Sequence, residues 1–201
     1  AIIGFSEIMM NELAGPLGHA SYKDYSRDIL ASGQHLLDMI NDILDIAKIE
    51  AGKMTITTQL IDPVDPVDAA MRMIRRKAEE KEIELMLDGA QNLPDIDADH
   101  RAIRQMVLNL VSNAIKFTDR GGRITVRVEQ RGPEIYFGVT DTGIGIPAED
   151  ISRLGHPFEQ VSKTKDRNTD GTGLGLALTK AFAEMHGGRL SLSSIYGEGT
   201  T

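Results

Sequence analysis

Residues 102–117 carry the strongest periodic pattern in the chain. Apolar side chains recur there at steps of three and four, as in an amphipathic helix with one face in a core: Ile103, Met106, Val107, Leu110, Val111 and Ala114. Polar side chains recur at steps of four, four and three along a second stripe: Gln105, Asn109, Asn113 and Lys116. The pattern predicts a helix that packs on one face and aligns two asparagine amides with a lysine ammonium.

The first fifty residues also have helical patterns. Residues 1–13 are predicted as one apolar helix, and Gly-Pro-Leu-Gly at 15–18 breaks it. Residues 22–50 are predicted as a long helix with apolar side chains in near-heptad spacing. Two such helices cannot cover their own apolar seams, so we expect an antiparallel hairpin that pairs with a second copy in a four-helix bundle. The alternative is a hairpin that packs on its own domain.

Beyond residue 52 the pattern mixes strands with helices. It predicts a helix at 66–82, another at 174–186, and strands at 54–60, 83–87, 95–97, 124–128, 135–139 and 189–195. The polar residues 151–172 are predicted as a mobile loop. We therefore expect an α+β chain with two domains, a helical hairpin at 1–51 and an α/β sandwich at 52–201, in which helices cover one face of a mixed sheet.

Composition narrows the class of protein. Cysteine is absent, which excludes disulfides, thiolate metal sites and cysteine nucleophiles. A formal net charge of -8 argues against a nucleic-acid partner, because such binding depends on an excess of basic side chains. No apolar run approaches the ~20 residues that span a bilayer, and the first residues lack the order of a signal peptide. We expect a soluble, cytoplasmic piece without a membrane segment.

Two glycine clusters are candidate nucleotide loops, at residues 141–145 and 171–175. Neither fits the phosphate loop G-x-x-x-x-G-K-[ST], and Leu178 stands where a dinucleotide fingerprint has its third glycine. Gly173 and Gly175 lie where a loop opens a predicted helix, so their backbone N–H groups and the helix N-terminus suit a triphosphate. The alternative for each cluster is a plain turn.

Polar residues near these clusters suit the same ligand. Asp141 ends a predicted buried strand, where its carboxylate needs a partner such as the amino group of a base. The alternative is a carboxylate that caps the Gly143 turn. Asn109 and Asn113 offer neutral oxygens suited to Mg²⁺, the alternative being helix-end packing, and Lys116 is placed to meet the same phosphates. The residues therefore predict one site for a nucleotide with Mg²⁺.

These segments resemble the motifs of two-component sensor histidine kinases, within the GHKL ATP-binding superfamily. Residues 109–117 resemble the N box, 141–147 the G1 box, 157–160 the F box and 171–176 the G2 box. Residues 1–50 resemble the dimerisation and phosphoacceptor hairpin, especially in the PleC/PdhS-like branch with PAS sensor domains. The resemblance covers the whole chain and implies that the α/β sandwich is of the GHKL (Bergerat) type.

The resemblance implies a protein-histidine kinase that binds ATP and Mg²⁺. It assigns the adenine amino group to Asp141, Mg²⁺ to Asn109 and Asn113, phosphate to Lys116 and the base to Phe117, with Asn109 and Lys116 as catalytic residues. The other implied ATP contacts are Gly143, Gly145, Ile146, Thr172, Gly173, Leu174 and Gly175. Residues 151–172 are then the ATP lid. The implied partners are a second copy, through the hairpin, and the receiver domain of a response regulator.

The histidine that the family phosphorylates does not occur in the chain. In the family an acidic residue and Pro-Leu follow it, about two helical turns before the position of Ala1. No histidine here has that context: His19, His35, His100, His156 and His186. We therefore expect residues 1–201 to bind Mg-ATP without phosphorylating themselves on that site. The alternatives are a pseudokinase or scaffold, a serine/threonine kinase of the superfamily, and an ATP-driven clamp, although clamps usually carry a water-activating glutamate in place of Asn109.

Overall fold

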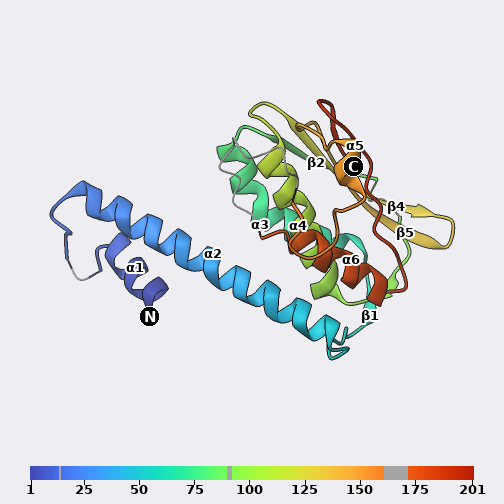
Figure 1. Ribbon diagram of the computed structural model, residues 1–201, viewed down its shortest axis with the longest axis horizontal. Helices are drawn as coiled ribbons and strands as arrows, with labels where there is room; N and C mark the ends of the chain where they lie inside the picture. The colour runs from blue at the N-terminus through green and yellow to red at the C-terminus, as the bar shows by residue number, and fades with distance from the viewer. Residues whose placement is uncertain (14, 90–91, 161–171) are drawn as a thin grey trace. The chain divides into compact units, whose positions relative to one another are not determined.

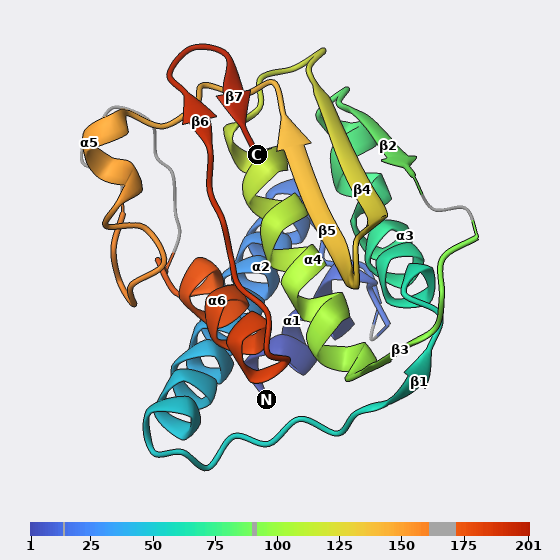
Figure 2. The same cartoon turned by 90° about the vertical axis from the view of Figure 1, so that its right-hand side faces the viewer.

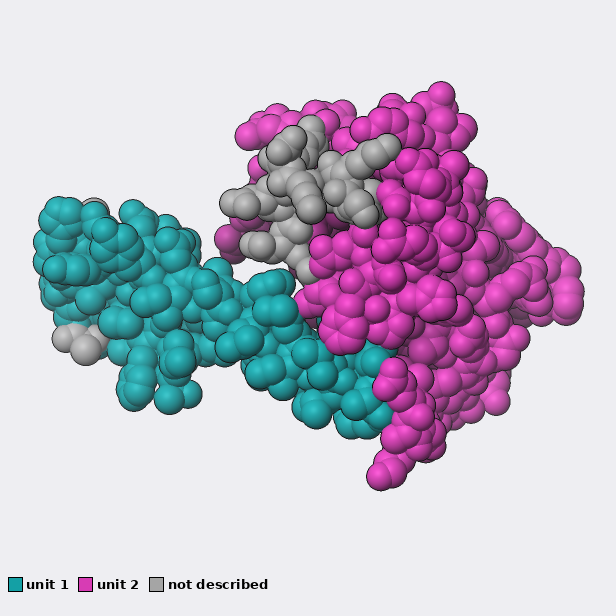
Figure 3. Space-filling model, viewed as in Figure 1, with its two compact units in different colours: residues 1–48 teal, residues 49–201 magenta. Residues whose placement is uncertain are grey.

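The computed structural model describes residues 1–13, 15–89, 92–160 and 172–201. The chain forms two compact units, Ala1–Lys48 and Ile49–Thr201 (Figure 3). The functional division between residues 51 and 52 stays a prediction. Within the described ranges, no helix is both long and apolar enough to cross a membrane.

The first unit is a helical hairpin, as the pattern predicts. Helix α1 spans Ile2–Met10 and helix α2 spans Ala20–Glu50 (Figure 1). The helices approach closely at Gly33, where a Cβ atom would lie 3.1 Å from Cγ1 of Ile3. Large apolar side chains of both helices remain exposed, among them Phe5, Leu36 and Ile43. The hairpin alone therefore leaves an apolar surface uncovered.

The second unit is built on a mixed sheet. Its strands are β2 (Glu84–Asp88), β4 (Arg123–Arg131), β5 (Glu134–Asp141), β6 (Ser194–Ile195) and β7 (Gly199–Thr200). They lie in the order β2-β4-β5-β7-β6; β2 runs parallel to β4, and the other neighbours are antiparallel. Strands β1 (Gln59–Ile61) and β3 (Ile96–Ala98) form a separate antiparallel pair.

Helices cover one face of this sheet. They are α3 (Val64–Glu80), α4 (His100–Phe117) and α6 (Gly175–Met185), and Figure 2 shows α4 behind β5. Helix α4 packs against both α3 and α6. The short helix α5 (Ala148–Ile151) follows the first glycine loop. The hairpin followed by an α/β sandwich confirms the predicted fold class.

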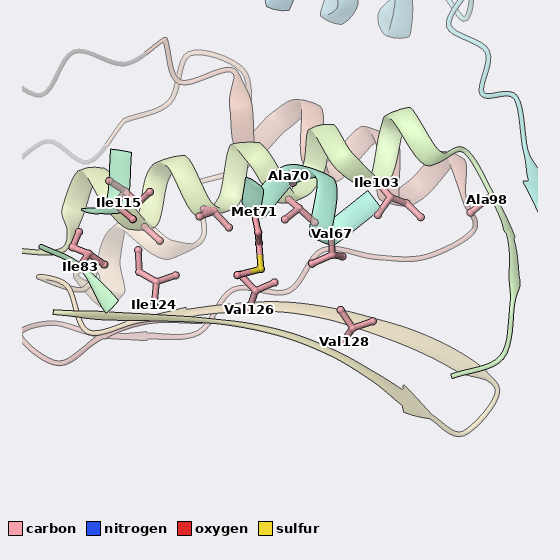
Figure 4. Close-up of a cluster of buried hydrophobic side chains, with 14 of the residues drawn as sticks. Val67, Ala70, Met71, Ile83, Ala98, Ile103, Ile115, Ile124, Val126 and Val128 are labelled. Carbon is pink, nitrogen blue, oxygen red and sulfur yellow. The ribbon is translucent and has the colours of Figure 1, made fainter. Parts of the chain in front are cut away.

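Apolar side chains at alternate positions of β4 fill the space between the sheet and the helices. Ile124, Val126 and Val128 are at most 1% exposed and point toward the helices (Figure 4). Met71 of α3 and Ile115 of α4 reach them from the other side. Burial of each such side chain contributes roughly 1.5 to 3 kcal/mol. This layer fixes α4 against the sheet, and α4 carries the predicted polar stripe.

Two predicted strands are longer than the observed ones. For the strand predicted at 54–60, the observed strand is only Gln59–Ile61. For the strand predicted at 189–195, it is only Ser194–Ile195. The threonine-rich stretch before β1 has strand propensity, but propensity forms a strand only beside a partner. The N–H of Thr57 instead donates to the Asp99 side chain, at 2.8 Å.

The segment after the first glycine loop is partly as predicted. Residues 152–160 form turns and irregular structure, and residues 161–171 of the predicted loop lie outside the described residues. Helix α5 and strand β7 were missed, because four and two residues are too short to show a period.

Candidate functional site

The start of α4 is capped by Asp99. Its Oδ1 accepts from the N–H groups of Arg101 (2.8 Å) and Ala102 (3.1 Å), and its Oδ2 accepts from Thr57 N–H (2.8 Å). Burial alone would raise the pKa of Asp99, but these three backbone donors outweigh it and hold the pKa below the ordinary 3.8. The cap therefore ties the segment before β1 to the first turn of α4.

His186, the residue directly after α6, is hydrogen-bonded to Asp99 as well. The Asp99 N–H donates to Nε2 of His186 at 3.0 Å, so Nε2 carries no proton. Nδ1 of His186 lies 2.7 Å from the Phe182 carbonyl, which can only accept, so Nδ1 carries the proton. These bonds give His186 a structural role.

The polar stripe of α4 faces the start of α6. Nδ2 of Asn109 donates to the Gly175 carbonyl at 3.1 Å, and Oδ1 of Asn109 accepts from Gln105 at 3.1 Å. Asn113, one turn later, is exposed. Lys116 is half-buried, with Nζ 4.9 Å from the centre of the Phe117 ring. The stripe thus begins at the second glycine segment and ends at Phe117.

The first glycine loop lies against the other end of α4. The Ile144 N–H donates to the Phe117 carbonyl at 3.2 Å. On its other side, Ile146 N–H donates to Oγ of Ser194 at 2.8 Å, and Gly197 N–H donates to the Ile144 carbonyl at 2.8 Å. The loop is therefore held between α4 and the turn that joins β6 to β7.

Backbone crowding explains the glycines of this loop. A Cβ on Gly143 would lie 2.6 Å from the Phe117 carbonyl oxygen, and one on Gly145 would lie 2.1 Å from that of Ile195. Gly145 also has φ +65. Neighbouring backbone therefore fills the space beside both glycines. Their absent side chains let the loop reach α4.

The second glycine segment opens α6. Oγ1 of Thr172 accepts from Leu174 N–H at 3.1 Å, and the Leu174 side chain is 1% exposed, which anchors the segment in the core. A Cβ on Gly173 would lie 2.9 Å from backbone of Phe158. Gly171 lies outside the described residues. The first N–H groups of an α-helix have no partner within the helix, and binding of phosphate by those of α6 stays a prediction.

Asp141 ends β5 at the first glycine loop. Its Oδ1 accepts from Gly143 N–H at 2.8 Å, so the turn-capping alternative is present. Burial raises the pKa of Asp141 above the ordinary 3.8, and backbone donors at Gly143 and Thr200 offset this only in part. A carboxylate accepts several hydrogen bonds, so the turn does not exclude a donor from a ligand. Such a donor would favour the charged form.

The donors present fit a metal that arrives with a nucleotide. Among the residues that the structure describes, His, Cys, Asp and Glu side chains form no group of three or more that could hold a metal ion. Mg²⁺ at Asn109 and Asn113 would depend on their amide oxygens together with phosphate oxygens, as is usual for this ion. Oδ1 of Asn109 already accepts from Gln105, so its second lone pair would be the one offered to the ion.

Two further polar residues were missed from the sequence. The Thr118 hydroxyl, directly after Phe117, is fully buried and has no hydrogen-bond partner within the described part of the chain. Lys81 bonds the end of α4 from the end of α3. Neither has a sequence signal, because both depend on which segments meet in the fold.

Two family models match the chain. Residues 98–201 match the histidine kinase-, DNA gyrase B- and HSP90-like ATPases, and residues 1–52 match the His Kinase A (phospho-acceptor) domain. The chain belongs to the histidine kinase family. The matched ranges cover α4, both glycine segments and the hairpin, so the family resemblance is confirmed.

Relatives of this kinase core are longer proteins. The chain is similar to two proteins of Caulobacter vibrioides over 100% of its length. It is 56% identical to the non-motile and phage-resistance protein and 45% identical to the histidine protein kinase DivJ. The chain spans 24% and 33% of their lengths. It is also similar to the crystal structure of full-length ShkA in complex with AMPPNP, with a TM-score of 0.80 and 28% identity over 99% of the chain and 40% of ShkA.

Proposed function

We propose that the chain is the Mg-ATP-binding core of a sensor histidine kinase, which transfers the γ-phosphoryl group of ATP to a histidine and onward to a response regulator. The position of α4 between the glycine segments supports this most. Its Asn109 is bonded to Gly175 and its Phe117 to Ile144. In this proposal residues 1–51 are part of the acceptor hairpin and residues 52–201 are the ATP-binding domain.

Each wall of the site has a proposed role. Asp141 accepts a hydrogen bond from the adenine amino group, and Phe117 packs against the base. The N–H groups at the start of α6 and the Lys116 ammonium face the phosphates. Asn109 and Asn113 would hold Mg²⁺, which neutralises phosphate charge when it is bound. The lid at residues 151–172 stays a prediction.

The proposed reaction is an in-line phosphoryl transfer. A bond forms between an imidazole nitrogen and the γ-phosphorus, the bond from that phosphorus to the oxygen bridging to the β-phosphate breaks, and ADP leaves. The protein contributes placement and charge neutralisation, because such transfers need little covalent chemistry from it. Lys116 is the side chain of this core proposed to meet the developing charge. The acceptor imidazole would come from outside residues 1–201, in cis or in trans.

The proposed partners follow from the hairpin. Exposed apolar side chains of α2, including Leu36, Ile40 and Leu44, would be covered by a second copy in a four-helix bundle. The receiver domain of a response regulator would take the phosphoryl group from the acceptor histidine. We place the reaction in the cytoplasm, where ATP is available.

The test is phosphorylation by γ-labelled ATP of a chain extended upstream by about twenty residues, enough to include the two missing helical turns. Acid-labile label that survives alkali supports a histidine kinase. Acid-stable label would indicate a serine/threonine kinase, and ATP binding without any label a pseudokinase. Steady ATP hydrolysis without a phosphoprotein would indicate a clamp. Residues 1–201 alone should bind ATP and stay unlabelled, and phosphohistidine on them would contradict the missing acceptor.

A further inference from the structure

The last turn of α4 carries two residues proposed to contact ATP, Lys116 and Phe117. An α-helix leaves its last four carbonyls without helical partners, so they need donors from elsewhere. Thr118 N–H donates to the Ala114 carbonyl at 2.9 Å, and the glycine loop supplies Ile144 N–H for Phe117 at 3.2 Å. The carbonyls between these two require another donor.

Lys81 supplies that donor. Its Nζ lies 2.6 Å from the Ile115 carbonyl oxygen and 2.9 Å from that of Lys116. Both bonds are charge-assisted, and a cation at a helix C-terminus opposes the negative end of the helix dipole. All four terminal carbonyls of α4 are thereby hydrogen-bonded, two of them by one side chain that is remote in sequence.

The backbone around Lys81 is held in place to make these bonds. Lys81 is the C-cap residue directly after α3, and Glu82 follows it with φ +56. The Glu82 carbonyl accepts from Gly121 N–H at 3.0 Å, and Glu84 N–H donates to the Gly122 carbonyl at 2.9 Å. The turn from α3 to β2, which begins at Lys81, is thus bonded to the loop that follows α4.

We propose that Lys81 is a positioning residue of the nucleotide site. It acts through the last turn of α4: by holding the Ile115 and Lys116 carbonyls, it fixes the direction in which the Lys116 and Phe117 side chains project. Without its ammonium, two carbonyls lose their donor and the turn is free to fray. The inference rests on the proposed function, because it concerns ATP contacts of α4.

The experiment compares four variants of the 201-residue chain by calorimetric titration with a non-hydrolysable ATP analogue and Mg²⁺. Lys81→Met should weaken binding by about five- to tenfold, because small misplacements of contact groups are costly. Lys81→Arg should bind within about twofold of the wild type, since a guanidinium also donates to two carbonyls. Lys77→Met removes the same charge one turn earlier, from an exposed position, and should change little. Val67→Ala, at a fully buried position of α3, should lower stability without changing the residues between α3 and β2.

The outcomes separate the two proposals. No binding by the wild type would overturn the proposed function and this inference with it. Normal binding by the wild type together with equal binding by Lys81→Met would overturn this inference alone. A loss for Lys77→Met as large as that for Lys81→Met would make the effect one of general charge. If Val67→Ala lowers the melting temperature as much as Lys81→Met does and weakens binding equally, the effect of Lys81→Met would be one of general stability. Either result would contradict a positioning role.

Discussion

Removal of the Asp99 carboxylate should destabilise the second unit substantially. One side chain accepts three backbone N–H groups, from Thr57, Arg101 and Ala102. Loss of a helix N-cap costs about 0.5 to 2 kcal/mol, and the further bond to Thr57 adds about 1 kcal/mol. Asp99→Ala should therefore lower the free energy of unfolding by about 1.5 to 3 kcal/mol. For a unit of this size the melting temperature should fall by about 3 to 12 °C.

The pH dependence tests the electrostatic part of this cap. The pKa of Asp99 is lower in the folded state than the ordinary 3.8, so its ionised form stabilises the fold above that pH. This stabilisation is lost as the pH falls through the folded-state pKa. Asp99→Asn keeps a capping oxygen without the charge. Its deficit against the wild type should therefore be full at pH 7 and shrink as the pH falls below 3.8.

Urea unfolding at a series of pH values measures both effects. The series should run from pH 7 to the lowest pH at which the wild type stays folded, with Asp99→Ala and Asp99→Asn in parallel. A deficit for Asp99→Ala under about 0.5 kcal/mol at pH 7, the level of an ordinary surface substitution, would refute the capping role. A deficit for Asp99→Asn that does not change with pH would refute the electrostatic part.

Three further predictions concern the site itself. Asp141→Ala should weaken ATP binding by about tenfold or more in calorimetry, because a hydrogen bond to a charged group contributes roughly 1.5 to 3 kcal/mol; unchanged affinity would remove the adenine assignment. Asp141→Asn should weaken binding too, yet unfold in urea at neutral pH no more easily than the wild type. Because the pKa of Asp141 is raised in the folded state, the carboxyl stabilises the fold at low pH and no longer does so once the pH has risen through the folded-state pKa. A variant that unfolds much more easily than the wild type at neutral pH would therefore contradict the raised pKa. Gly145→Ala should lower the melting temperature far more than Gly132→Ala. Both glycines have positive φ, but only a Cβ on Gly145 meets backbone, at 2.1 Å from the Ile195 oxygen, and equal losses would exclude crowding as the cause.

The sequence predicted those parts of the site that depend on local pattern. Helix α4 was predicted at 102–117 and observed at His100–Phe117, because its apolar period matches the face that it buries. The spacing of Asn109 and Lys116 along one helix follows from the same geometry. The glycine clusters were identified from the local sequence, and their described residues include Ile144 and Gly175, which bond to α4.

The remainder depends on contacts between distant segments. Gly145 needs to be glycine because the Ile195 carbonyl approaches it, and no pattern near residue 145 contains that information. The bonds from His186 to Asp99 and from Lys81 to α4 join residues far apart in sequence. A lysine after a helix and a histidine at a helix end are common, so their partners become known only from the fold.

Amide chemical shifts report directly on where a nucleotide binds. Spectra of the ¹⁵N-labelled 201-residue chain should be recorded during titration with a non-hydrolysable ATP analogue and Mg²⁺, up to about 1 mM. Binding between α4 and the glycine segments predicts saturable shifts that are largest at residues 141–146, at the start of α6 and at Lys116 and Phe117. Absence of saturable shifts, or shifts that are largest in the hairpin at residues 1–48, would contradict an ATP site on α4.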